Sequence, residues 1–166
     1  MKEKGYKSRY LWLTAAVVWM FVIFGFSSQK AEESSEISGT LVYHIVEGVN
    51  GIAHLNWKEE ILLKYASLLE HPVRKAAHMT EYAILACILL GNCMQYPALQ
   101  KRRYLWAELG AASYAATDEF HQLFVEGRSG ELKDVAIDST GAALGLLLAW
   151  AVISIWKQLR NKRRKR

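Results

Sequence analysis

Two short motifs each place an imidazole and a carboxylate three residues apart: His78-x-x-Glu81 and Asp118-x-x-His121. On an α-helix this spacing puts both side chains on one face, within reach of each other. A carboxylate in that position can orient a histidine as the general base that acts on a bound substrate. Both motifs lie at the end of an otherwise apolar segment, where ionisable side chains indicate a functional site.

Further polar residues accompany these motifs. The candidates for a reactive or polar core are His78, Glu81, Asp118, Glu119, His121 and Gln122. The candidates for holding a phosphate or carboxylate are the cations Arg74, Lys75 and Arg128, because guanidinium and ammonium groups bind such anions. The residues expected to orient the cations or complete the site are Ser28, Gln29, Asp134 and Asp138.

These residue types fit more than one chemistry. Glu-x-x-His pairs on facing helices can build metal sites, but here one motif has the reversed order and the ligands are too few. We therefore assign no metal ligand, and the sequence identifies no cofactor. General-base catalysis by His78 or His121 and simple binding of an anionic lipid headgroup both remain open, because the residue types do not separate them.

A structural interpretation of the same residues is also available. Arg74 or Lys75 can pair with Asp134 or Asp138, and His78 can bond to Glu119. Such pairs would neutralise one another and hold helix ends together. The number of polar residues in the set exceeds what helix packing requires, which favours a functional site.

The elements that must position these residues are four apolar segments, predicted as membrane spans at about 10–28, 73–94, 104–124 and 134–156. The first has the basic start of a signal peptide, but its length and aromatic content favour a retained helix. Region 29–72 begins with an acidic stretch, 30–38, and continues with amphipathic pieces at 39–49 and 56–69. Pro72 suits the first turn of the helix that follows. Apolar residues make up 52% of the chain and charged residues 22%, which excludes intrinsic disorder.

The distribution of basic residues predicts the topology. Fourteen of the 21 Lys and Arg residues lie in segments 1–10, 97–103 and 157–166. The positive-inside rule then places both termini in the cytoplasm of a multi-pass plasma-membrane protein. The tail 157–166 is explained as a cytoplasmic anchor to lipid headgroups, so no nucleic-acid partner is expected. The fold class is therefore an all-α integral membrane four-helix bundle, with an extracytoplasmic amphipathic helical region between the first and second spans.

This topology brings the polar ends of all four spans to the outer side of the membrane. Asp134, Asp138, Gly141 and Gly145 share one stripe of the last helix. The GxxxG spacing of the two glycines would let that helix pack closely against a helical partner. Because charges in lipid are costly, the polar faces are expected to turn inward and meet.

The ordered motifs resemble those of the VanZ-like family of small bacterial membrane proteins. Residues 73–82 read Val-Arg-Lys-Ala-Ala-His-Met-Thr-Glu-Tyr, similar to the family pattern RKxxHxxEY. Residues 117–122, Gly127-Arg128 and segment 134–141 are similar to its second pattern, DExxQ…GR…DxxxDxxG, and the Ser27-Ser28-Gln29 exit from the first helix also matches. The resemblance covers about residues 10–156. Glu126 departs from the proline that often precedes Gly-Arg in the family.

The resemblance implies one VanZ-like domain, residues 1–166, in the plasma membrane of, typically, a Gram-positive bacterium. The founding member of the family is linked to low-level resistance to teicoplanin, a glycopeptide antibiotic that acts at the outer surface. We expect a protein that binds, and in one version modifies, an anionic lipid-linked or cell-wall component at the outer leaflet, with membrane lipids as partners. The alternatives are a membrane-embedded hydrolase or transferase that uses the His/Asp/Glu cluster, and a non-catalytic membrane scaffold. Transport is disfavoured because only Glu108 is charged in the cytoplasmic halves of the helices.

Overall fold

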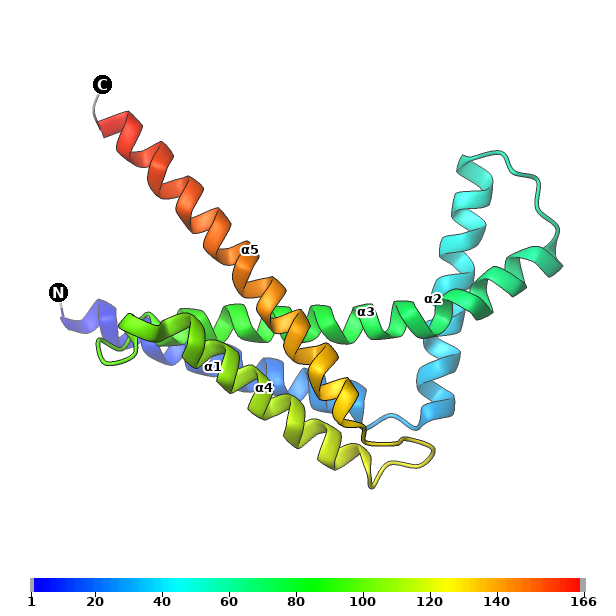
Figure 1. The fold of residues 1–166 in the computed structure, drawn as a ribbon, viewed down its shortest axis with the longest axis horizontal. Helices are drawn as coiled ribbons and strands as arrows, with labels where there is room; N and C mark the ends of the chain where they lie inside the picture. The colour runs from blue at the N-terminus through cyan, green and yellow to red at the C-terminus, as the bar shows by residue number, and fades with distance from the viewer. Residues whose placement is uncertain (1, 165–166) are drawn as a thin grey trace.

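The computed structural model describes residues 2–164, and its regular elements there are helical, so the all-α prediction is confirmed. Figure 1 shows the arrangement, with the two ends of the chain lying at the same end of the molecule. The elements are α1 (Lys2–Ser27), α2 (Ala31–Ile52), α3 (Glu59–Cys93), the 3₁₀ turn η1 (Gln100–Arg102), α4 (Arg103–Gln122) and α5 (Leu132–Arg164).

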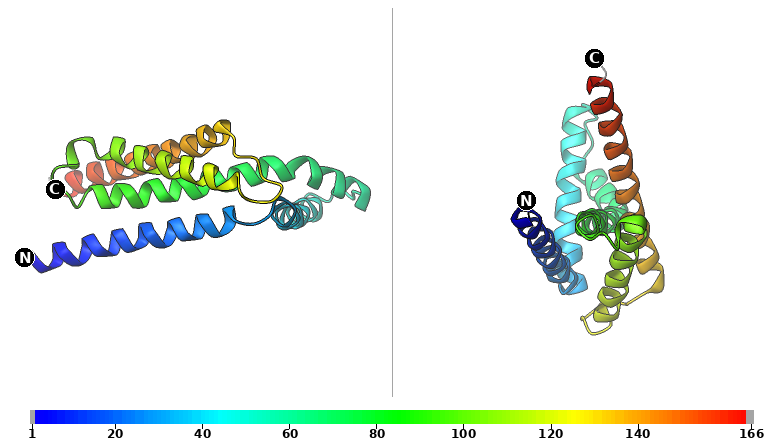
Figure 2. Two further views of the ribbon diagram at one scale, coloured as in Figure 1. Left: turned by 90° about the horizontal axis from the view of Figure 1, so that it is seen from below. Right: turned by 90° about the vertical axis from the view of Figure 1, so that its left-hand side faces the viewer.

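Three of these helices are long and apolar enough to cross a membrane: α1 from Ser8, α3 and α5. The helix α4 is not among them, because it carries Arg103, Glu108, Asp118 and Glu119 within 20 residues. The predicted fourth span at 104–124 therefore stays a prediction. α1, α3 and α4 nevertheless run alongside one another in the left view of Figure 2, and α5 crosses α3 at an angle in Figure 1.

The start of the second predicted span differs from the expectation. A separate helix was expected to begin near Pro72, but α3 is continuous from Glu59 to Cys93 and contains Pro72 in its interior. The predicted amphipathic piece 56–69 is therefore largely the first part of α3. Proline cannot donate a backbone hydrogen bond and usually kinks a helix. In agreement, the N-terminal part of α3 turns away from the axis of the remainder (Figure 1).

The helix α2 is also longer than expected and includes the acidic stretch 30–38 from Ala31 onward. Glu32 and Glu33 lie in its first turn, where negative charge is favourable next to the positive end of the helix dipole. Val42 and Val46 of α2 are buried in a small cluster with Leu62 and Ala66 of α3. α2 and the N-terminal part of α3 therefore form a hairpin with its own apolar contact.

The bundle core is built from small side chains that allow close helix approach. In α4, Ala107, Ala111 and Ala115 are fully buried at a spacing of four residues. In α5, Gly141 and Gly145 lie directly against the backbone of α3 near Met79 and Ala83. The helical neighbour of the GxxxG stripe is thus α3 of the same chain. Gly141 lies about one helical turn after Asp138. The close contact of α5 with α3 at Gly141 therefore also sets the position of the acidic residues of α5.

Three hydrogen bonds between a side chain and the backbone attach α1 to the other helices, one near Trp12 and two at the level of Trp19 and Met20. The indole of Trp19 donates to the carbonyl of Glu81 at 2.9 Å, and the amide of Asn92 donates to the carbonyl of Trp12 at 2.8 Å. The hydroxyl of Tyr114 donates to the carbonyl of Met20 at 2.6 Å. α1 is therefore held to both α3 and α4.

Candidate functional site

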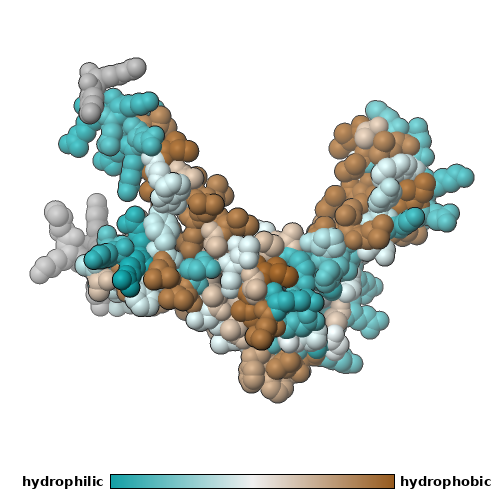
Figure 3. All heavy atoms as spheres, in the orientation of Figure 1, coloured by the Kyte–Doolittle hydropathy of each residue, from teal (hydrophilic) through white to brown (hydrophobic). Residues whose placement is uncertain are grey.

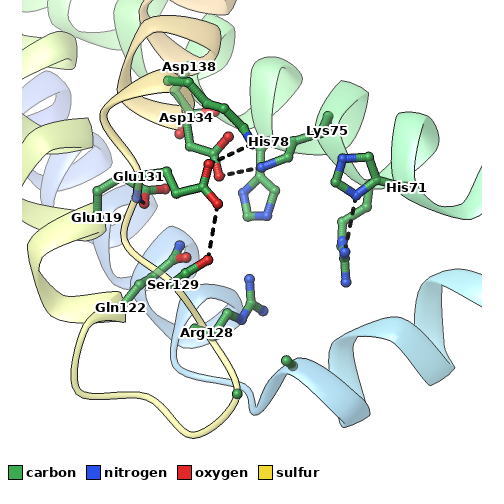
Figure 4. A pocket seen from close by; sticks show the side chains of 14 residues that line it. His71, Lys75, His78, Glu119, Gln122, Arg128, Ser129, Glu131, Asp134 and Asp138 are labelled. Carbon is green, nitrogen blue, oxygen red and sulfur yellow. Dashed lines mark hydrogen bonds and ion pairs between the residues drawn. The ribbon is translucent and has the colours of Figure 1, made fainter.

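A polar cavity of about 140 Å³ opens where α3, α4 and α5 meet the turn 123–131 and the start of α2 (Figure 4). The residues that line it are Ala31, His71, Arg74, Lys75, His78, Glu119, Gln122, Gly127, Arg128, Ser129, Glu131, Lys133, Asp134 and Asp138. Eight of the thirteen predicted site residues are among them. The topological argument that polar helix ends would meet at one level therefore agrees with the geometry.

Two of the three predicted anion-binding cations are engaged in contacts between helices. Lys75 of α3 forms an ion pair with Asp134 of α5. Arg74 donates a hydrogen bond to the Ser35 hydroxyl of α2 at 2.7 Å and lies 3.4 Å from a carboxylate oxygen of Glu70. The structural interpretation thus accounts for Lys75, and it accounts for Arg74 through partners that the sequence did not indicate.

Arg128 differs from the other two cations. Its Nε donates to the carbonyl of Gln29 at 3.2 Å, while its Nη2 is buried and has no hydrogen-bond partner within the described part of the chain. Burial and the neighbouring charge of Arg74 lower the pKa of Arg128, although an arginine stays charged at neutral pH. Figure 4 shows its guanidinium directed into the cavity. Arg128 therefore has donors available for an anion.

The first motif forms the pair that its spacing predicted. The Nδ1 atom of His78 lies 3.5 Å from Oε2 of Glu81, and both side chains are mostly buried. The His78 ring projects into the cavity, which buried Asp138 also lines (Figure 4). Glu81 is not among the residues that line the cavity. The two groups form an ion pair when His78 is protonated, while Oε2 of Glu81 has no hydrogen-bond partner in the described part of the chain.

The second motif does not form a pair among the residues described. His121 packs against Phe24 of α1, with ring centroids 4.5 Å apart, and is not among the residues that line the cavity. Asp118 is only 3% exposed and is not among the residues that line the cavity, so its carboxyl group is enclosed within the bundle. Glu119 accepts a hydrogen bond from the backbone N–H of Glu131 at 3.0 Å, which holds the turn before α5 in place.

Ser27, not Ser28, is the serine that joins the site. Ser28 is exposed and its hydroxyl donates to the carbonyl of Phe24 in its own helix at 2.6 Å. Ser27 is fully buried and accepts a hydrogen bond from Nε2 of Gln122 at 3.0 Å. Gln29 contributes its backbone carbonyl, to Arg128. Neighbouring helical residues differ by about 100° in direction, so the position of α1 against α4 decides which serine faces inward.

Besides His71 of α3, the sequence argument missed three polar residues of the cavity lining, Ser129, Glu131 and Lys133. They lie in the turn and at the start of α5, where no helical periodicity gives a direction to a side chain. Glu131 and Lys133 could have been suspected, because they are charged residues in or next to a short connection between two polar helix ends. Nothing in the sequence distinguished Ser129.

We expect Ser27→Ala to lower the free energy of unfolding by about 1–3 kcal/mol, because it leaves the buried amide of Gln122 without its acceptor. The control is Ser28→Ala, where the exposed hydroxyl bonds only within its own helix. That change should cost less than about 0.5 kcal/mol. Unfolding of both variants in detergent micelles measures the difference. Equal stability of the two variants would show that the Ser27–Gln122 hydrogen bond does not hold α1 to α4.

The described residues include no cluster of three or more His, Cys, Asp or Glu side chains arranged to hold a metal ion. Cys87 and Cys93 are free thiols.

The model of one protein family, described as VanZ/LLP1, matches residues 12–155. No curated protein and no solved structure matches the chain.

Proposed function

The chain belongs to the VanZ/LLP1 family, and we propose that it is a cell-envelope membrane protein that binds an anionic headgroup at the outer leaflet. In this proposal α4 joins the three apolar helices as a fourth span, and both termini are cytoplasmic. The positive-inside distribution of Lys and Arg supports this orientation. A role in glycopeptide resistance is a prediction from the resemblance alone.

The observation that carries the proposal is the guanidinium of Arg128, whose Nε bonds to the carbonyl of Gln29 while its Nη2 has no hydrogen-bond partner in the described part of the chain. An arginine binds phosphate or carboxylate through two parallel N–H donors, and these hydrogen bonds are stronger than neutral ones. Among the described residues the buried Nη2 of Arg128 has no partner, and it lies beside a cavity large enough for more than one water molecule. Lys75 and Lys133 line the same cavity, but each is paired with a carboxylate, of Asp134 and of Glu131, so Arg128 is the cation with a donor left for an anion. A phosphate or carboxylate group of a lipid or lipid-linked envelope component fits this chemistry.

The test is identification of the lipids that co-purify with the full chain in native nanodiscs. We expect wild type to carry one anionic or polyprenyl-linked lipid in excess over the bulk membrane. Arg128→Ala should reduce that lipid about tenfold or more, which corresponds to loss of a charged hydrogen bond. Arg128→Lys should give an intermediate loss, because it keeps the charge but not the bidentate geometry.

The matched control is Lys64→Ala, which removes one exposed cation from the N-terminal part of α3. It should leave the co-purified lipid unchanged. If wild type and Arg128→Ala carry the same bulk lipid, the proposal is wrong and the polar residues serve to hold helix ends together.

A second candidate function is a membrane-embedded hydrolase or transferase, and the His78–Glu81 pair at the cavity favours it. The same lipid analysis tests this candidate. A chemically altered form of the bound lipid in wild type, absent in His78→Gln, would support catalysis. A scaffold that assembles through GxxxG is less well supported, because Gly141 and Gly145 already pack against α3 within the chain.

A further inference from the structure

One face of α2 carries a continuous row of exposed aliphatic side chains. We define the α2 stripe as Ile37, Leu41, Ile45, Val49 and Ile52. Each of these side chains is at least 51% exposed, and Ile52 is 85% exposed. The acidic residues Glu32, Glu36 and Glu47 point to the other side of the helix, by its 100° rotation per residue. A contiguous exposed apolar surface of this kind marks an interaction site.

The direction of α2 relates this surface to the membrane. α2 begins at Ala31, only a few residues after α1 ends at Ser27. In the left view of Figure 2 α2 is seen end-on while α1 runs across the view, so the two helices are nearly perpendicular. The last turns of α1 expose Phe21, Phe24 and Phe26. A helix that follows a span this closely and turns across it must run along the membrane surface.

The packing of α2 decides which side the stripe faces. Val42 and Val46 of α2 pack against α3 and are buried. The α2 stripe consists of the apolar side chains of α2 that α3 does not cover. Figure 3 shows apolar surface on the flank of the α2–α3 hairpin that turns toward α5, and hydrophilic surface on the opposite rim. The uncovered apolar flank therefore faces the side on which the spanning helices lie in lipid.

We infer that the α2 stripe is embedded in the lipid interface at the carboxyl-terminal end of α1, with the acidic face of α2 in water. An amphipathic helix of this type inserts its apolar face about 5–10 Å into the boundary between headgroups and acyl chains. The inference holds for either orientation of the chain and does not depend on a bound ligand. It also has a consequence for the cavity, since Ala31 of α2 lines it and Ser35 bonds to Arg74. α2 in the interface would hold the cavity at the level of the lipid headgroups.

The test is the accessibility of spin labels on the full chain in nanodiscs of phosphatidylcholine and phosphatidylglycerol. Cys87 and Cys93 are first replaced by alanine, and single labels are placed through Ile45→Cys and, as the matched control, Glu36→Cys. We expect the label at position 45 to collide with oxygen several-fold more than with a water-soluble nickel chelate, at a depth of about 5–10 Å below the phosphates. The label at position 36 should show the reverse preference.

Two other outcomes would overturn the inference. If the label at position 45 collides mainly with the nickel chelate, the stripe lies in water. If it collides with neither reagent, a protein surface or a second copy of the chain covers the stripe. Circular dichroism of each labelled variant confirms that its helix content is unchanged, so that an altered accessibility reports position and not unfolding.

Discussion

Replacing Gly141 by alanine is expected to lower the free energy of unfolding of the helix bundle by about 3 kcal/mol, at the upper end of the range for overpacking. A Cβ atom on Gly141 would overlap the carbonyl oxygen of Met79 and would lie 2.6 Å from the Cα of Met79. These atoms belong to the backbone of α3, which cannot rotate away as a side chain can. α5 would have to move off α3, and the adjoining contacts of both helices would loosen.

Unfolding by heat or SDS in detergent micelles measures this effect. Gly145→Ala should also destabilise, but less, because its Cβ would meet the carbonyl of Ala83 at 2.7 Å. Gly25→Ala is the matched control, since that glycine lies in another apolar helix with nothing within 4 Å of its Cβ. It should change stability by less than about 1 kcal/mol. If Gly141→Ala proves as stable as Gly25→Ala, the close crossing of α3 and α5 is wrong.

The parts of the fold that could be predicted are those fixed by hydropathy alone. The first and last apolar runs correspond to α1 and α5, because a helix surrounded by lipid only needs a long apolar stretch. The common level of the polar helix ends followed from the order of the spans. α4 gave a weaker signal, because it carries Asp118 and Glu119, whose charges count against a membrane span even though both side chains are buried in the bundle.

Features that depend on tertiary contacts could not be predicted. Pro72 is compatible with a helix start, and only the packing of Leu62 and Ala66 on α2 shows that α3 begins thirteen residues earlier, at Glu59. The choice between Ser27 and Ser28 needs the rotation of α1 against α4. Ion-pair partners likewise follow from the α3–α5 crossing, which the sequence indicates only as a GxxxG spacing.

The ion pair between Lys75 and Asp134 gives the second large effect. Lys75→Ala is expected to lower the free energy of unfolding by about 3 kcal/mol, because it leaves a carboxylate in a mostly buried position without its partner. The side chains of Lys75 and Asp134 are only 23% and 13% exposed, and Oδ1 of Asp134 already lacks a hydrogen bond in the described chain. Removing the ammonium would leave Asp134 to neutralise itself or draw in water.

Two comparisons separate this effect from the loss of any lysine. Lys133→Ala breaks a nearby pair with Glu131 whose side chains are 66% and 41% exposed, so it should cost less than about 1 kcal/mol. The double change Lys75→Met/Asp134→Leu removes both charges and should restore most of the stability, since well-packed apolar residues can replace a buried pair. A double variant as unstable as Lys75→Ala would show that the two charges do not act on each other. If the double variant recovers stability and still binds lipid as wild type does, the two cations have different roles. Lys75 then joins α3 to α5, and Arg128 binds the anion.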